Sequence, residues 1–363
     1  LRIPDLAPLF RRWPVALNPH YASLVQRFES KLVELVPNPK TREQMRKANL
    51  RLFASLWWPI VTLHRLETVA YYSLWVFLWD DEIDCAGLSM GEDEKHEEGA
   101  EEEVRRARAM QYIKFHLGVT MMEQKGYQNG EELVAPTKAT RIVREPAEWV
   151  RDSGNKGVAE RLVVELERYM EACGVEQRHL ESGSLPTGEE YWKRRLGTSA
   201  VFTYCALTEY LIGVTLPDKL FETAEMKAMW TEVNRNVSII NDILSLKKEI
   251  GGSMYSSIPV MMKETGQDAQ AVIEDLLVSL EESADTFDQA AGSLLGRIRD
   301  DDDWKFLLAV SRAPVMNVMN MADMMGSRLA ADRYGVTKYI IIISYSAVVT
   351  KYIQEDNSLL IPL

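Results

Sequence analysis

The chain has 363 residues, of which 46% are hydrophobic, so it is long and apolar enough to bury a sizeable core. It carries 42 basic and 54 acidic residues, and its net charge of −12 argues against nucleic acid or an anionic membrane as the main partner. The three cysteines have no CxxC or Cys/His spacing, which indicates neither a disulfide framework nor a zinc site and favours the cytoplasm. No window approaches ~18 consecutive apolar residues and no secretory signal is visible, so we expect no membrane insertion.

Apolar residues recur at helical spacing along most of the chain, beginning at 24–36, where the run stops at Pro37-Asn38-Pro39. Long stretches without two-residue alternation, and the lack of a linker rich in Gly, Ser or Pro, predict one all-α domain over 1–363. The same helical spacing predicts further helices at 40–57, 60–80, 101–125, 156–180, 187–213, 219–250, 268–296 and 300–330.

Three segments fit this pattern less well. The block GEDEKHEEGAEEE at 91–103 is expected to be a solvated acidic loop or a frayed helix start. The segment YIIIISY at 339–345 is compatible with a strand or with a buried helix. We interpret RDDDDW at 299–304 as a loop or a helix start rather than as the acidic motif of a protonation-initiated enzyme.

A cluster of carboxylates follows the apolar helix predicted at 60–80, in LWVFLWDDEID. Asp80 and Asp84 are four residues apart and share one helical face, whereas Asp81 points about 100° away. Like charges at this spacing destabilise a helix, so a cation should compensate them. Oxygen ligands without histidine or thiolate nearby suit Mg²⁺. The alternative is a helix end that frays into an acidic loop.

A second polar group lies in NDILSLKKE at 241–249, inside the long predicted helix. Asn241, Ser245 and Glu249 recur every four residues and share one face. An unsatisfied Asn in an apolar helix is costly, so a role as a ligand explains Asn241 better than packing does. A polar stripe that faces solvent remains the alternative.

Together, DDxxD and NDxxSxxxE resemble the motifs of class I terpene cyclases of microbial, especially fungal, type. The resemblance covers nearly the whole chain and implies an α-helical barrel whose two motifs hold three Mg²⁺ ions on a prenyl diphosphate. It implies ligand roles for Asp80, Asp84, Asn241, Ser245 and Glu249. It also places the C-terminal segment 336–363 near the mouth of the active site.

The resemblance extends to groups that contact the diphosphate. Family members place an arginine 46 residues before the asparagine of the triad, and that position is Arg195. The helix is expected to break just after it, at Gly197, with Thr198 and Ser199 as linker and effector. Further diphosphate contacts implied in the same way are Lys248, Arg333 and Tyr334.

Aromatic residues that stabilise a carbocation must differ here from those of many bacterial members, because the usual tryptophan position is Ser327. Phe77 lies one turn before Asp80 on roughly the same face, and further candidates are Trp58, Tyr72 and Trp304. Core packing is an equally good explanation for each of them.

The resemblance therefore implies a secondary-metabolism enzyme, a monomer or homodimer, that cyclises farnesyl diphosphate to a C15 product. Geranylgeranyl diphosphate is the next candidate substrate. Two further alternatives stay open. A chain-elongating prenyl transferase shares the fold but normally carries a second DDxxD where this chain has NDILSLKKE. A non-enzymatic helical scaffold would explain the periodicity but not the spacing of Arg195.

Overall fold

The computed structural model describes residues 1–3, 6–10, 17–84, 100–119, 133–182, 185–250, 256–300 and 359–360. Helices dominate these residues, and the prediction of an all-α fold is confirmed. The helices are α1 (Ala7–Phe10), α2 (Tyr21–Leu35), α3 (Pro39–Ala48), α4 (Leu50–Trp57), α5 (Leu63–Asp84), α6 (Ala100–His116), α7 (Lys138–Ile142), α8 (Arg144–Asp152), α9 (Lys156–Ser182), α10 (Gly188–Thr198), α11 (Val201–Ile212), α12 (Asp218–Phe221), α13 (Ala224–Ile250), α14 (Ser257–Thr265) and α15 (Ala269–Asp300).

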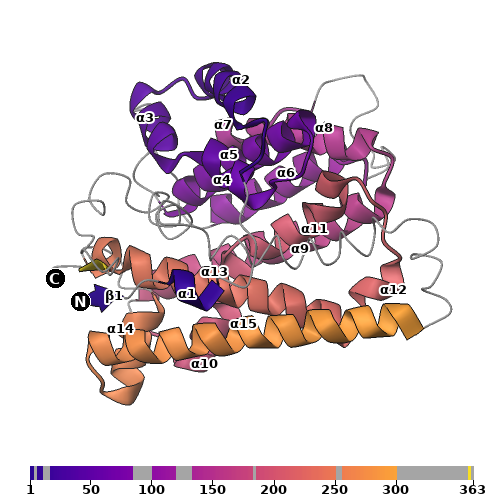
Figure 1. Ribbon diagram of the computed structural model, residues 1–363. Helices are drawn as coiled ribbons and strands as arrows, with labels where there is room; N and C mark the ends of the chain where they lie inside the picture. The colour runs from indigo at the N-terminus through magenta and orange to yellow at the C-terminus, as the bar shows by residue number, and fades with distance from the viewer. Residues whose placement is uncertain are drawn as a thin grey trace.

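The helices, whose arrangement is shown in Figure 1, pack around two hydrophobic cores. The first core joins side chains of α2 to α9, and its largest fully buried members include Trp58, Trp75 and Trp79. The second core joins α1 and α12 to α15, where the long helices α13 and α15 run side by side. The helices that carry the two predicted metal motifs, α5 and α13, therefore belong to different cores.

Helix α11 connects the two cores. Every residue from Val201 to Leu211 is buried, and the one charged side chain among them, Glu209, forms an ion pair with Arg161. Val201 and Cys205 pack in the second core, whereas Tyr204 and Leu207 pack in the first. Its C-terminus is capped by Gly213, whose φ of 77° is the left-handed conformation that glycine adopts at helix ends.

Several helix boundaries differ from the sequence prediction. The helix predicted at 40–57 is divided at Asn49, which adopts a left-handed conformation with φ of 50°, and Asn tolerates this conformation better than most residues. The helix predicted at 187–213 is divided between Thr198 and Val201. Helices α7, α8 and α14 are too short to give a clear periodic pattern, and the prediction missed them.

The only strands among the described residues are β1 (Arg2–Ile3) and β2 (Leu359–Leu360), which pair antiparallel. Gln270 at the start of α15 fixes β1, since its side chain accepts from the backbone N–H of Arg2 and donates to the Arg2 carbonyl. Of the acidic block 91–103, residues 91–99 lie outside the described residues and residues 100–103 form the start of α6. The segments 301–330 and 339–345 also lie outside them, and so does the C-terminal segment 336–363 apart from the two residues of β2.

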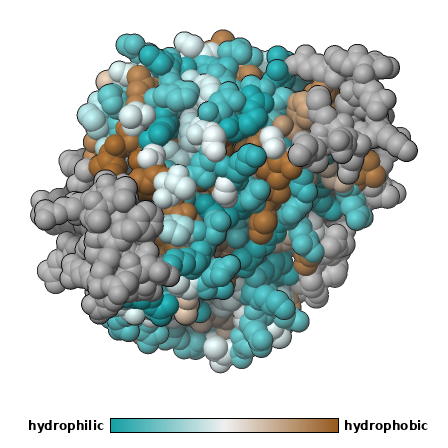
Figure 2. Space-filling model, turned by 90° about the vertical axis from the view of Figure 1, so that its right-hand side faces the viewer, coloured by the Kyte–Doolittle hydropathy of each residue, from teal (hydrophilic) through white to brown (hydrophobic). Residues whose placement is uncertain are grey.

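The face shown in Figure 2 is mostly hydrophilic, and its apolar side chains form small separate patches. Large apolar residues that are exposed are scattered over the fold, for example Val33 on α2, Ile60 in the turn between α4 and α5, and Val164 on α9. None of the helices in the described ranges combines the length and the apolar character that a membrane-crossing segment needs.

Candidate active site

The first predicted ligand, Asp80, is exposed near the end of α5. The hydroxyl of Tyr169 on α9 donates to its Oδ1 at 3.5 Å. Burial raises the pKa of Tyr169 well above its ordinary value, so the phenol stays protonated and acts as a donor. Asp84 lies in the last turn of α5, and its side chain is outside the described part of the structure.

The second group of predicted ligands lies on one face of α13. Asn241 is half-buried there, and Ser245, one turn further along, is 4% exposed. Lys248 and Glu249 belong to the last turn of α13, and their side chains also lie outside the described residues.

Arg195 on α10 contacts this face directly. Its Nη2 donates to Oδ1 of Asn241 at 2.8 Å, and its Nε donates to Oδ1 of Asp242 at 3.0 Å. Asp242 is 1% exposed, and its Oδ2 also accepts from the Tyr191 hydroxyl at 2.6 Å and from the backbone N–H of Ser257 at 3.3 Å. A buried carboxylate with three donors holds its partner in a fixed orientation. The guanidinium of Arg195 is therefore oriented before any ligand arrives.

The helix that carries Arg195 is interrupted close behind it, as the resemblance implied. Thr198 is the last residue of α10, and Ala200 has a φ of 58°, which is uncommon for a residue with a side chain. Gly197 was expected to mark the break, but it remains helical. A Cβ at this position would lie 2.6 Å from the Cβ of Ala172, so the glycine allows α10 to approach α9 closely.

The predicted linker and effector lie at the break itself. Thr198 is 8% exposed, and its Oγ1 has no hydrogen-bond partner among the described residues. The hydroxyl of Ser199 donates to Oδ1 of Asn234 on α13 at 2.7 Å. The break is thus tied to the same helix that carries Asn241.

The aromatic candidates differ in their surroundings. Phe77 is half-buried and meets Phe53 edge to face, with ring centroids 6.5 Å apart. Trp58 is 2% exposed and packs between Trp57 and Tyr204, which supports core packing for this residue. The remaining candidates, Trp304, Arg333 and Tyr334, lie outside the described residues.

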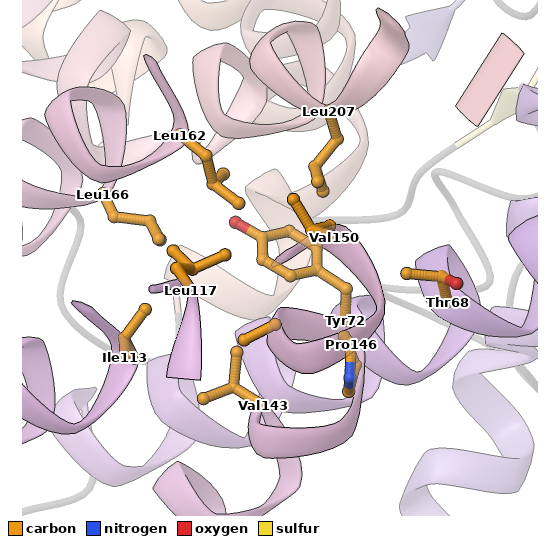
Figure 3. A pocket seen from close by; sticks show the side chains of 11 residues that line it. Thr68, Tyr72, Ile113, Leu117, Val143, Pro146, Val150, Leu162, Leu166 and Leu207 are labelled. Carbon is orange, nitrogen blue, oxygen red and sulfur yellow. The ribbon is translucent and has the colours of Figure 1, made fainter. Parts of the chain in front are cut away.

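Tyr72 lines a small cavity in the first core (Figure 3). The cavity has a volume of about 10 Å³, and its walls are apolar side chains such as Leu162, Leu166 and Leu207. A cavity this small admits at most one water molecule. Tyr72 is therefore a core residue beside a packing defect.

The donor atoms of the candidate site fit a hard divalent cation. Asp80, Asn241 and Ser245 offer carboxylate, amide and hydroxyl oxygens, which suit Mg²⁺. Within the described ranges, no three His, Cys, Asp or Glu side chains come together as a metal cluster. The side chains of Asp84 and Glu249, which complete the two predicted sets of ligands, are outside the described part of the structure.

Known proteins are similar to this chain in sequence and in fold. Residues 71–285 match the model of terpene synthase family 2, C-terminal metal binding. The chain is 32% identical over 337 residues to the sesquiterpene cyclase hepA of Aspergillus oryzae, which covers 92% of this chain and 89% of that protein. It is 28% identical over 283 residues to sesquiterpene synthase 6 of Postia placenta, covering 76% and 75%.

Among solved structures, the linalool/nerolidol synthase from Streptomyces clavuligerus is similar with a TM-score of 0.67 at 13% identity, covering 92% of this chain and 97% of that one. Germacradien-4-ol synthase from Streptomyces citricolor has a TM-score of 0.64 at 16% identity, covering 91% and 96%. The fold is that of the class I terpene synthases. The chain belongs to the terpene synthase family, which confirms the family prediction.

Sequence reasoning missed residues that support the site. Asp242 was visible as an acidic residue inside an apolar helix, but only the structure shows that it pairs with Arg195. Tyr169, Tyr191 and Asn234 gave no signal, because a tyrosine or asparagine in a helical pattern has many possible surroundings.

Proposed function

We propose that this protein is a Mg²⁺-dependent sesquiterpene cyclase that ionises farnesyl diphosphate, releases diphosphate and closes the allylic cation to a C15 hydrocarbon or alcohol. The contact of Arg195 with Asn241 carries the proposal, because it places a positively charged guanidinium beside a predicted metal ligand of α13. Two relatives whose names state sesquiterpene chemistry support a C15 substrate.

Three Mg²⁺ ions are expected. Asp80 and Asp84 on α5, and Asn241, Ser245 and Glu249 on α13, would hold them from two sides of the site. When bound, the ions neutralise negative charge that develops on the leaving diphosphate.

Arg195 contributes a positively charged guanidinium whose orientation is already fixed. Asp242 holds its Nε, and Asn241 accepts from its Nη2, so little reorganisation is needed when diphosphate binds. Lys248, Arg333 and Tyr334 are proposed to add further donors to the diphosphate, by their sequence positions alone.

The carbon skeleton requires an apolar, water-free cavity, because an allylic cation reacts with water. Phe77 is the best supported aromatic wall, since it is half-buried and stands one turn before Asp80 on α5. An aromatic face there would stabilise positive charge on the chain of the substrate.

Product analysis tests the proposal. Purified protein and Mg²⁺ are incubated separately with geranyl, farnesyl and geranylgeranyl diphosphate, and then with geranyl plus isopentenyl diphosphate, and the products are identified by gas chromatography–mass spectrometry. We expect a cyclic C15 product and inorganic diphosphate from farnesyl diphosphate alone. A C20 hydrocarbon as the main product would assign the enzyme to geranylgeranyl diphosphate, elongation would assign it to the prenyl transferases, and no consumption of any substrate would refute catalysis.

A further inference from the structure

The break between α10 and α11 is fastened to α13 by one buried amide. Asn234 is fully buried, and its Nδ2 donates to the carbonyl of Leu196 at 2.7 Å. In an unbroken helix this carbonyl would accept from the backbone N–H of residue 200. The Asn234 side chain therefore replaces a hydrogen bond that the break removes.

The oxygen of the same amide is linked to the residues that follow the break. Oδ1 of Asn234 accepts from the hydroxyl of Ser199 at 2.7 Å, and the Oγ of Ser199 accepts from the backbone N–H of Val201 at 3.3 Å. Ser238, one turn along α13, donates to the same Oδ1 at 3.2 Å and fixes the orientation of the amide. One side chain thus links the last turn of α10 to the first residue of α11.

We call the hydrogen bonds of Asn234 to Leu196 and Ser199 the clamp. The position of Asn234 on α13 connects the clamp to the candidate metal site. Asn234, Ser238, Asn241 and Ser245 follow the spacing i, i+4, i+7 and i+11, which places them on one helical face. Arg195, immediately before Leu196, contacts Asn241 on that face. The last turn of α10 is therefore held to α13 both at Asn241 and at Asn234.

We propose that Asn234 is a positioning residue of the cyclase. Its amide fixes the geometry of the 196–201 break relative to the metal-ligand face of α13, and it thereby sets the conformation in which the cation is folded and shielded from water. The functional part of this inference rests on the proposed cyclase activity. The clamp itself does not, and it is measurable without substrate.

A matched pair of variants isolates the clamp. Asn234→Ala removes the amide at the break. Asn236→Ala removes a second buried amide from α13, one that donates instead to Ser283 of α15 at 2.9 Å and to the Glu232 carbonyl. Both substitutions delete a buried amide from the same helix, and only the first touches the break.

Hydrogen exchange of the free enzyme is the first readout. We expect amides of residues 196–204 to exchange roughly five- to thirtyfold faster in Asn234→Ala, since losing one or two kcal/mol of local stability has that effect. In Asn236→Ala this segment should exchange as in the wild type. Equal acceleration in both variants would refute the clamp. If Asn234→Ala does not fold, Ser199→Ala breaks the same link from the other partner and is measured in its place.

The product mixture from farnesyl diphosphate is the second readout. Asn234→Ala should release a larger fraction of acyclic alcohol relative to cyclic product, whereas Asn236→Ala should keep the wild-type ratio. Faster exchange with an unchanged product ratio would overturn the positioning role. A wild-type enzyme that consumes no prenyl diphosphate would refute the proposed function, while the exchange experiment would still decide whether the clamp exists.

Discussion

Arg195 and Arg161 form two similar buried ion pairs at different places in the fold. The side chain of Arg195 is 16% exposed and that of Arg161 is 18% exposed, and the side chains of their carboxylate partners, Asp242 and Glu209, are each 2% exposed. Only Arg195 also contacts a predicted metal ligand. Comparing substitutions of these two arginines therefore distinguishes the effect of losing a buried ion pair on stability from an effect on diphosphate binding.

We predict that Arg195→Ala lowers the free energy of unfolding by about 3 kcal/mol, because it leaves a buried carboxylate without its charge partner. It should also abolish the rise in Tm that Mg²⁺ plus inorganic diphosphate gives the wild type, a linkage effect of about 1–3 kcal/mol. Arg161→Ala should cost similar stability and keep the ligand-induced rise. Thermal unfolding with and without ligand measures both, and a full rise in Arg195→Ala contradicts the assignment.

Phe77 and Phe28 provide a second comparison at single residues. Phe77 is half-buried on α5, whereas Phe28 on α2 is 1% exposed. We predict that Phe77→Leu changes the proportions of C15 products with little loss of stability. Phe28→Leu should lower the unfolding midpoint and leave the proportions unchanged. Gas chromatography measures the product proportions and urea unfolding measures the stability of both variants. If Phe77→Leu behaves like Phe28→Leu, Phe77 is a core residue.

The family resemblance predicted one of the contacts in the site and helical periodicity missed another. Family members place an arginine 46 residues before the asparagine, which led to the prediction that Arg195 and Asn241 share a site, and the two side chains are in contact. The contact of Tyr169 with Asp80 joins residues 89 apart on α9 and α5, and helical periodicity carries no information on which helices become neighbours.

At the scale of helices, the approach of α10 to α9 depends on Gly197. Gly197→Ala should destabilise the protein by about 1–3 kcal/mol through overpacking against Ala172, and adding Ala172→Gly should recover part of the loss. Gly292 in α15 is the control, because nothing lies within 4 Å of its Cβ direction. Gly292→Ala should stabilise the helix by about 0.5–1 kcal/mol. Additive effects of the two substitutions at 197 and 172, in chemical denaturation, would contradict this packing.

The end of α5 carries a separate prediction. Asp80→Asn keeps the size of the side chain and removes its charge, so turnover of farnesyl diphosphate should fall by several orders of magnitude while helical circular dichroism persists. Asp152→Asn removes an exposed carboxylate from the end of α8 and should have no effect on turnover. Steady-state kinetics make the comparison, and an active Asp80→Asn enzyme would exclude this carboxylate as an essential ligand.

Long periodic helices were predictable and their interruptions were less so. The patterns at 156–180 and 268–296 correspond to α9 and α15 within a few residues. The division at Asn49 depends on one left-handed residue, and apolar spacing continues across it. The break after α10 was expected only from resemblance, because its conformation depends on contacts from α13.

At the scale of the whole molecule, the predicted metal ligands come from helices of both cores. Asp80 belongs to a helix of the first core and Asn241 to a helix of the second. We predict that Mg²⁺ plus inorganic diphosphate slows hydrogen exchange at the C-terminal ends of both α5 and α13, since a shared ligand stabilises both cores together. Excess chelator should reverse both effects and stop turnover. Protection of one helix alone would show that the two motifs do not share the ligand.

The place of α11 between the cores has a consequence for synthesis on the ribosome. Tyr204, Leu207 and Leu211 complete the core formed by α2 to α9, so that core lacks one wall until residue 212 has left the ribosome. Its tryptophans stay partly uncovered while more than half of the chain is already made. Nascent chains that stop before α11 expose apolar surface and are expected to need chaperones, whereas chains that include α11 can close the first core before α13 to α15 emerge.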